Sequence, residues 1–220
     1  MYSERIRLAS LRDRIVDAAA AAALIEDGMT VGISGFGCAG DAKAVPFALA
    51  ERARHEPVRI SLVTGASIGN GLDKLLAESG ALARRMPFQA DAALRKAINA
   101  GQVMFVDQHL SETVEQMRSH QLKRPDIAVI EAVAITEEGH IVPTASVGNS
   151  ASLALFADQV IVEISLRYGT DLEGLHDIYI PADRPGRAPI PLVSPDQRIG
   201  ATAIPVDPAR IAAIVVSDYR

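Results

Sequence analysis

Residues 31–40 read Val-Gly-Ile-Ser-Gly-Phe-Gly-Cys-Ala-Gly, and this stretch decides the fold class of the 220-residue chain. A short apolar strand there runs into three glycines, Gly35, Gly37 and Gly40, and then into a segment with helical spacing. Glycine lets the backbone turn sharply and lets a ligand approach the main chain closely. Because the unpaired N–H groups of the following helix point back at this loop, the pattern favours a phosphate, a carboxylate or a developing oxyanion as a ligand.

Apolar strands and helices alternate along the rest of the chain. Strands are predicted at residues 29–34, 58–64, 103–106, 127–135, 160–164 and 211–216. Helices are predicted at residues 43–54, 72–78, 92–99 and 150–157, and another from Ser10 to Gly28, where Ser10 and Asp13 resemble a capping box. Strands that are apolar on both faces predict an α/β fold, with an open, mostly parallel sheet and helices on both faces. The Pro-rich residues 171–209 are expected to run over the surface.

Three polar, glycine-bearing loops follow predicted strands, at residues 35–40, 65–71 and 146–150. In open α/β sheets, ligands bind at the carboxyl ends of the strands. We therefore expect these three loops to lie together at one rim of the sheet.

Composition narrows the classes of function. The net charge of −5, with acids and bases interspersed, argues against a nucleic-acid or anionic-membrane surface. A single cysteine excludes an intrachain disulfide and a cysteine-rich metal site, and no histidine pattern predicts a metal ion. The longest apolar run, residues 18–25, is too short to span a membrane, and no signal-peptide core follows the N-terminus. We expect a cytoplasmic protein, with a mitochondrial location as the alternative that the Arg-rich start suggests.

The glycine loop also permits a different ligand. Gly35, Gly37 and Gly40 match the dinucleotide-binding pattern G-x-G-x-x-G between a strand and a helix. The second strand ends in Thr64 and Gly65, without the acid that binds the ribose in that class of site. An NAD-binding domain therefore stays a less favoured alternative.

Other candidate residues have both structural and functional interpretations. Cys38 is favoured as a small residue of a tight loop over a reactive thiolate, because no base lies near it in sequence. Glu131 interrupts an apolar strand, so it is either functional or paired with an Arg or Lys. Four further polar residues are candidates whose side chains often only form hydrogen bonds within the local structure. They are His109, at a strand end, and Ser67, Asn149 and Ser150, in loops next to glycine.

Several ordered motifs together resemble one known family. They are residues 34–36 with 43–46, then 62–67, 94–101, 107–111, 130–136, 146–150, 172–179 and 198–200. This set is similar to the acetyl-CoA hydrolase / acetate CoA-transferase family, a group of class I CoA-transferases. The resemblance implies a CoA-transferase-like fold and two similar domains with the active site between them. It also implies chemistry in which a glutamate attacks an acyl-CoA thioester, and CoA then passes through a glutamyl-CoA thioester to a carboxylate or is lost to water.

By the same resemblance, residues 1–220 form the N-terminal domain, and the glutamate belongs to a second domain outside this chain. The isolated chain is therefore expected to be inactive, and Glu131 is not the nucleophile. Coenzyme A is expected as a substrate, from acetyl-, succinyl- or propionyl-CoA, with no permanently bound cofactor. The expected partners are the chain's own C-terminal domain or a second subunit, and a second copy in a homodimer. A non-catalytic CoA- or carboxylate-binding module is the alternative.

The resemblance also assigns site residues. Ser67 matches a serine that lines the active site, and the loop facing the acyl pocket is matched by Gly35, Phe36, Gly37 and Gly40. Asn149 and Ser150 match a loop on the same rim, and Arg220 falls near an arginine beside the active site. The chain departs from the family pattern at Asp41-Ala42, where Gly-x-Pro is usual before Lys43, and at Gly37-Cys38, where Thr is usual. These departures change the pocket side of the loop and thus the acyl preference.

Overall fold

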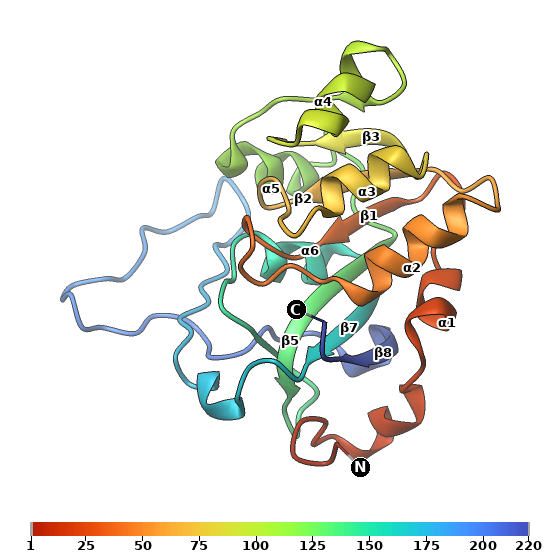
Figure 1. Ribbon diagram of the computed structural model, residues 1–220. Helices are drawn as coiled ribbons and strands as arrows, with labels where there is room; N and C mark the ends of the chain where they lie inside the picture. Colours follow the sequence, from red (N-terminus) through yellow and green to blue (C-terminus); the bar gives the residue numbers. More distant parts are fainter. Residues whose placement is uncertain (1, 220) are drawn as a thin grey trace.

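The computed structural model describes residues 2–219. One sheet dominates it, with the strand order β4-β3-β2-β1-β5-β7-β8 and β6 paired to β5 (Figure 1). The strands are β1 (Thr30–Ile33), β2 (Ile60–Thr64), β3 (Leu82–Met86), β4 (Met104–Phe105), β5 (Ile127–Ile135), β6 (Ile141–Pro143), β7 (Gln159–Ser165) and β8 (Ile211–Ser217). Every strand pair is parallel except β5 with β6. The predicted mostly parallel sheet is confirmed.

Helices cover both faces of this sheet. They are α1 (Ala18–Ala23), α2 (Ala44–Ala53), α3 (Leu72–Glu78), α4 (Ala92–Asn99), α5 (Leu110–Arg118) and α6 (Ser150–Phe156). Side chains of β5 alternate between the two faces: Ile127 and Val129 join α1 to α4 in one hydrophobic cluster, and Ala128 and Ile130 join α5 and α6 in another. The apolar character of both strand faces, seen in the sequence, follows from this double burial.

The direction in which successive strands are added to the sheet reverses at β1. From β1 it moves outward through β2, β3 and β4, then returns to β5 on the other side of β1 and continues to β7 and β8. Such a switch point leaves a crevice at the carboxyl ends of the two central strands, because their connections leave toward opposite edges of the sheet.

The predicted helix from Ser10 to Gly28 is confirmed only at Ala18–Ala23, so it is wrong in its first half and at its end. The chain forms a 3₁₀ turn at Ala9–Arg14, and Ile15 then pairs with Ile214 of β8. The helix α1 starts only after Asp17, whose side chain accepts a hydrogen bond of 2.7 Å from the N–H of Ala20. Pairing with the free edge of β8 thus overrides the helical spacing, and Asp17 supplies the cap that Ser10 was predicted to give.

Two strands and one α-helix were not predicted, and the other predicted strands and helices are confirmed to within two residues. β3 reads Leu-Ala-Arg-Arg-Met, and its two arginines interrupt the apolar pattern that would predict a strand. α5 is mostly polar and buries only Thr113 and Met117. β6 has three residues and pairs with β5, and its Ile141 also forms a bridge with Ile204. None of the three has a periodic apolar pattern long enough to predict a helix or a strand from sequence.

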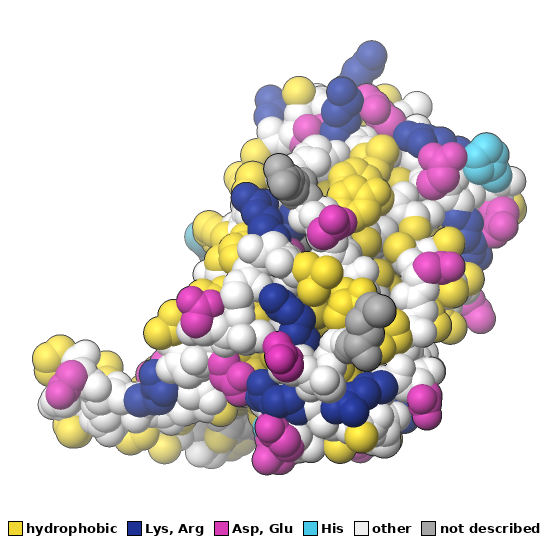
Figure 2. Space-filling view, turned by 60° about the horizontal axis from the view of Figure 1, so that its bottom comes forward, with side chains coloured by type: hydrophobic (Ala, Val, Ile, Leu, Met, Phe, Trp, Pro, Cys, Tyr) yellow, Lys and Arg dark blue, Asp and Glu magenta, His cyan; other side chains and the backbone are white. Residues whose placement is uncertain are grey.

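The predicted surface excursion at residues 171–209 is confirmed. It forms a long arm, light blue in Figure 1, that leaves the body and returns where Ala201 pairs with Ile178. Figure 2 shows the arm standing out from the body, with hydrophobic and charged side chains together. On the face in that view, cationic and anionic side chains are interspersed. Among residues 2–219, no helix has both the length and the apolar character needed to cross a membrane.

Candidate functional site

Three loops meet at the switch point. We name them rim loop 1 (residues 35–40, after β1), rim loop 2 (residues 65–71, after β2) and rim loop 3 (residues 146–150, between β6 and α6). The N–H of Gly37 donates to the carbonyl of Ser67 at 3.0 Å, and the N–H of Gly69 donates to the carbonyl of Gly37 at 2.7 Å. These two bonds join rim loops 1 and 2.

Rim loop 3 joins the group through Ser146. Its hydroxyl donates to the carbonyl of Ala39 at 2.8 Å. The expectation that the three loops share one rim of the sheet is therefore confirmed.

Glycine is required where these loops touch. Gly35 has a φ of +126°, and a Cβ there would lie 2.7 Å from the Cα of Asp41. A Cβ on Gly65 would lie 2.9 Å from the carbonyl oxygen of Gly35. The glycines therefore serve the close packing of loop on loop, in addition to leaving the backbone accessible.

The N-terminus of α2 is occupied from inside the protein. The carboxylate of Glu163, on β7, accepts hydrogen bonds from the N–H groups of Lys43 at 2.9 Å, Ala44 at 2.8 Å and Val45 at 3.2 Å. The sequence predicted that an external anion would bind at this helix end. The chain's own carboxylate lies there instead, because β7 runs beneath the start of α2. Burial raises the pKa of Glu163, although the three N–H bonds act to lower it.

A buried ion cluster lies under the rim loops. The Nζ of Lys43 donates to Glu131 Oε1 at 3.0 Å and to the carbonyl of Asp41 at 2.6 Å, and it lies 3.4 Å from Asp41 Oδ1. The other oxygen of Glu131 accepts from the hydroxyl of Thr144 at 2.5 Å. Of the two interpretations of Glu131, pairing with a cation is confirmed. Burial acts to lower the pKa of Lys43, but the two carboxylates outweigh it and raise that pKa.

The same cluster connects the rim loops to one another. Asp41 directly follows rim loop 1, and its Oδ2 accepts from Nδ2 of Asn70, in rim loop 2, at 2.7 Å. Thr144 lies two residues before rim loop 3. Through the carboxylates of Asp41 and Glu131, one ammonium group thus links rim loop 2 with the residues that flank rim loops 1 and 3.

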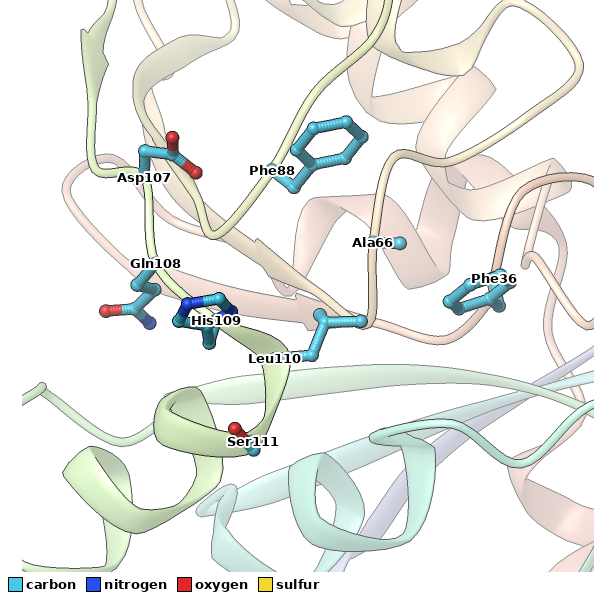
Figure 3. Close-up of a pocket in the computed structure, with 8 residues that line it drawn as sticks. All are labelled: Phe36, Ala66, Phe88, Asp107, Gln108, His109, Leu110 and Ser111. Carbon is cyan, nitrogen blue, oxygen red and sulfur yellow. The ribbon is translucent and has the colours of Figure 1, made fainter.

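A hollow of about 750 Å³ opens beside rim loops 1 and 2 (Figure 3). Its lining is Phe36, Ala66, Phe88, Asp107, Gln108, His109, Leu110 and Ser111. Figure 3 shows two phenylalanines and Leu110 from separate segments, with the polar residues 107–109 along the strand-to-helix connection that enters α5. The hollow therefore has an apolar wall and a polar wall.

Of the predicted site residues of rim loops 1 and 2, one lines this hollow and the others lie elsewhere in the two loops. Phe36 lines it and is 53% exposed, and the half-exposed Ser67 directly follows the lining residue Ala66. Gly37 bonds to rim loop 2, whereas Gly40 packs against Ser146. Cys38 is exposed in rim loop 1, above Gly69.

Rim loop 3 holds the other two predicted residues. Asn149 precedes α6, and its Nδ2 is buried with no hydrogen-bond partner among residues 2–219. Ser150 is buried at the first position of α6. Arg220 lies outside the described residues.

Sequence analysis did not identify Phe88 as part of the site, nor the buried ion pairs that Lys43 forms with Asp41 and Glu131. Phe88 follows the unpredicted strand β3, and the burial of Asp41 and Lys43 has no local sequence signal. Within residues 2–219, no group of three His, Cys, Asp or Glu side chains is arranged to hold a metal ion. The first acid after β2, Asp73, is buried against Arg85, so it does not supply the ribose ligand that an NAD site needs.

Comparison with known proteins gives a consistent picture. Residues 4–216 match the family model described as acetyl-CoA hydrolase/transferase N-terminal domain. The chain is 42% identical to a succinyl-CoA:acetate CoA-transferase of Clostridium kluyveri, over 99% of this chain and 41% of that protein. It is 36% identical to an acetyl-CoA hydrolase of Yarrowia lipolytica, over 100% of this chain and 44% of that protein. The chain thus spans about two fifths of the length of these relatives.

Solved structures support the fold. The glutaconate coenzyme A-transferase of Acidaminococcus fermentans matches with a TM-score of 0.64 at 12% identity, over 94% of this chain and 76% of that chain. The expectation of a CoA-transferase-like fold is therefore confirmed.

Replacing Lys43 by Met leaves Glu131 and Asp41 buried without their counter-charge. We expect a loss of about 3–5 kcal/mol in the free energy of unfolding, measured by urea denaturation. The control is Lys74→Met, because Lys74 forms an exposed pair with Glu78 at 4.0 Å, and its loss should change that free energy by less than about 0.5 kcal/mol. Equal effects of the two substitutions would contradict the account of the cluster.

The raised pKa of Glu163 predicts a pH dependence. Because the folded chain holds this proton more tightly, the group's contribution to stability is complete below its ordinary pKa of 4.5 and is lost as pH rises through the folded pKa. Glu163→Gln removes this titration. The stability of the variant relative to the native chain should therefore rise with pH above 4.5. Urea denaturation at a series of pH values checks this, and a constant difference would refute it.

Proposed function

The chain belongs to the acetyl-CoA hydrolase/transferase family, as its N-terminal domain, and from this premise we propose that it forms one wall of the acyl-CoA site of a CoA-transferase or acyl-CoA hydrolase. The observation that carries the proposal is the junction of three rim loops at the switch point, next to a hollow with an apolar wall. The reaction moves CoA between an acyl-CoA and a carboxylate, and water in place of the carboxylate gives hydrolysis.

The nucleophile comes from another part of the complete protein. Nucleophilic attack on a thioester needs a carboxylate with a free oxygen that can reach the substrate. Both oxygens of Glu131 accept bonds, from Lys43 and Thr144, and Glu163 is fixed by three N–H groups beneath α2. The two buried glutamates of this chain are thus committed to structure, which supports a glutamate on a further domain or subunit.

This chain contributes positioning and exclusion of water. Phe36 and Phe88 present apolar surface on the side where an acyl group would lie, and a dry site strengthens every electrostatic contact to the reacting atoms. The hydroxyl of Ser67 is our candidate donor to the oxyanion that forms when the thioester carbonyl is attacked. The buried Nδ2 of Asn149, which lacks a partner among residues 2–219, is a second polar group for the substrate.

The hollow of about 750 Å³ has room for the acyl group of acetyl-, propionyl- or succinyl-CoA, which we propose as donors. Its polar wall carries His109 and Ser111, whose N–H and O–H groups can donate to a carboxylate-bearing substrate. CoA is a substrate in this proposal and not a resident cofactor. The complete protein contains the further domain or subunit, assembles as a homodimer and works in the cytoplasm, with the mitochondrion as the alternative compartment.

The 220-residue chain alone should transfer no CoA from acetyl-CoA to succinate, because it lacks the nucleophile. Adding the remaining part of the protein should restore succinyl-CoA formation, followed by liquid chromatography of the CoA esters. Turnover by the chain alone would contradict the proposal. Binding of acetyl-CoA by calorimetry with no turnover in the complete protein would favour the non-catalytic binding module.

Ser67→Ala in the complete protein should lower kcat by about 10-fold or more, because one donor to the developing charge is lost. The melting temperature should stay unchanged, since the side chain is half-exposed. Ser119→Ala, at the exposed end of α5, is the matched control and should leave both quantities as they are. An unaltered kcat for Ser67→Ala would remove this serine from the site.

A further inference from the structure

Arg85 is the largest side chain that the core of this domain buries completely. It lies on β3 with 0% exposure and pairs with Asp73 of α3, its Nε 2.9 Å from Asp73 Oδ1. We propose that Arg85 and Asp73 form a positioning pair that fixes Ser67 toward the substrate. This inference rests on the role proposed above for Ser67, and it adds two residues that act through the backbone of rim loop 2.

The pair holds the residue before Ser67. Nη2 of Arg85 donates to the carbonyl of Ala66 at 3.0 Å, and the hydroxyl of Thr64 donates to the same carbonyl. The direction of the peptide group that enters Ser67 is thus set by two buried donors.

The pair also holds the residue after Ser67. The N–H of Ile68 donates to Asp73 Oδ2 at 3.3 Å, and the same oxygen accepts from Nη2 of Arg85 at 3.3 Å. Both peptide groups that flank Ser67 therefore end on one ion pair. The carbonyl of Ser67 itself accepts from Gly37, so the backbone of this residue is anchored on three sides.

The same guanidinium also bonds to the segment that precedes Phe88. Nη1 of Arg85 donates to the carbonyl of Met86, two residues before Phe88. One planar group thus links the backbone around Ser67 with the segment that carries Phe88. A shift of Arg85 would change the spacing between the proposed oxyanion donor and the apolar wall.

Stability alone does not explain a charged pair at this position. A buried ion pair loses its hydration, and well-packed apolar side chains in its place are often neutral or stabilising. The guanidinium has five N–H donors in a rigid fork, which suits simultaneous bonds to Asp73, Ala66 and Met86. A lysine would keep the charge on a single nitrogen and would not hold all three acceptors.

The test is Arg85→Lys, with Arg84→Lys as the matched control from the adjacent, half-buried position of β3. Hydrogen–deuterium exchange in the full 220-residue chain should become about 10-fold faster or more at residues 66–69 in Arg85→Lys, as the loss of a hydrogen bond to a charged group predicts. The control should exchange like the native chain. Unchanged exchange at these residues in Arg85→Lys would overturn the proposal.

A double-mutant cycle in the complete protein separates positioning from a general loss of structure. Arg85→Lys should lower kcat by about 10- to 100-fold with little change in KM, because a small displacement of a positioned group is costly. In a Ser67→Ala background the same substitution should lower kcat little further. Losses that multiply would show that Arg85 acts independently of Ser67 and would overturn the inference.

Two further outcomes remain informative. If Ser67→Ala leaves kcat unchanged, the proposed role of Ser67 fails, and the exchange experiment still decides whether Arg85 fixes the loop. If Arg85→Lys does not fold, the double variant Arg85→Met with Asp73→Leu replaces it, since an apolar pair is expected to keep the fold. That variant should show the same faster exchange and lower kcat, and native values of both would overturn the proposal.

Discussion

The bond between the Lys43 ammonium and the Glu131 carboxylate, 3.0 Å long and out of contact with water, is the interaction on which the site depends. It joins the start of α2 to the central strand β5. Asp41 and Thr144 attach to its two ends and extend it to the rim loops. Removing either partner leaves a buried charge, which costs far more than the intact pair contributes. The geometry of the rim is therefore fixed from below, by a cluster that no substrate needs to touch.

Much of the fold follows from local sequence. Strands such as β5 and β7 are apolar on both faces, so their burial and their parallel pairing are predictable from composition and alternation with helices. The failures occur where tertiary contacts decide. Ile15 pairs with the edge of β8 in place of continuing a helix, and β3 buries Arg85 where a strand is expected to carry apolar residues. A single sequence shows neither the edge nor the partner carboxylate.

The meeting of the three loops was predictable, whereas the contacts beneath them were not. The glycine loops after β1 and β2 predicted the rim where the loops meet beside the hollow, because ligands bind where parallel strands end. The sequence did not show that Glu163 would occupy the N-terminus of α2, since these residues are about 120 positions apart along the chain. Nor did it show that Phe88 faces the same hollow as Phe36. The family supplies the chemistry, whereas the contacts of this chain show which of its carboxylates are not free to act.

The most direct measurement is covalent capture of the substrate. An acetyl-CoA analogue with a photoreactive group in place of the acyl chain would be irradiated in the complete protein, and the labelled peptides mapped by mass spectrometry. The account predicts labels on rim loops 1 and 2 and on Phe88, with protection by excess acetyl-CoA. A second hollow is lined by Ala18 and Ala19 of α1 and by Phe47 and Ala48 of α2. Labels confined to that hollow, with none on the rim loops, would contradict the account.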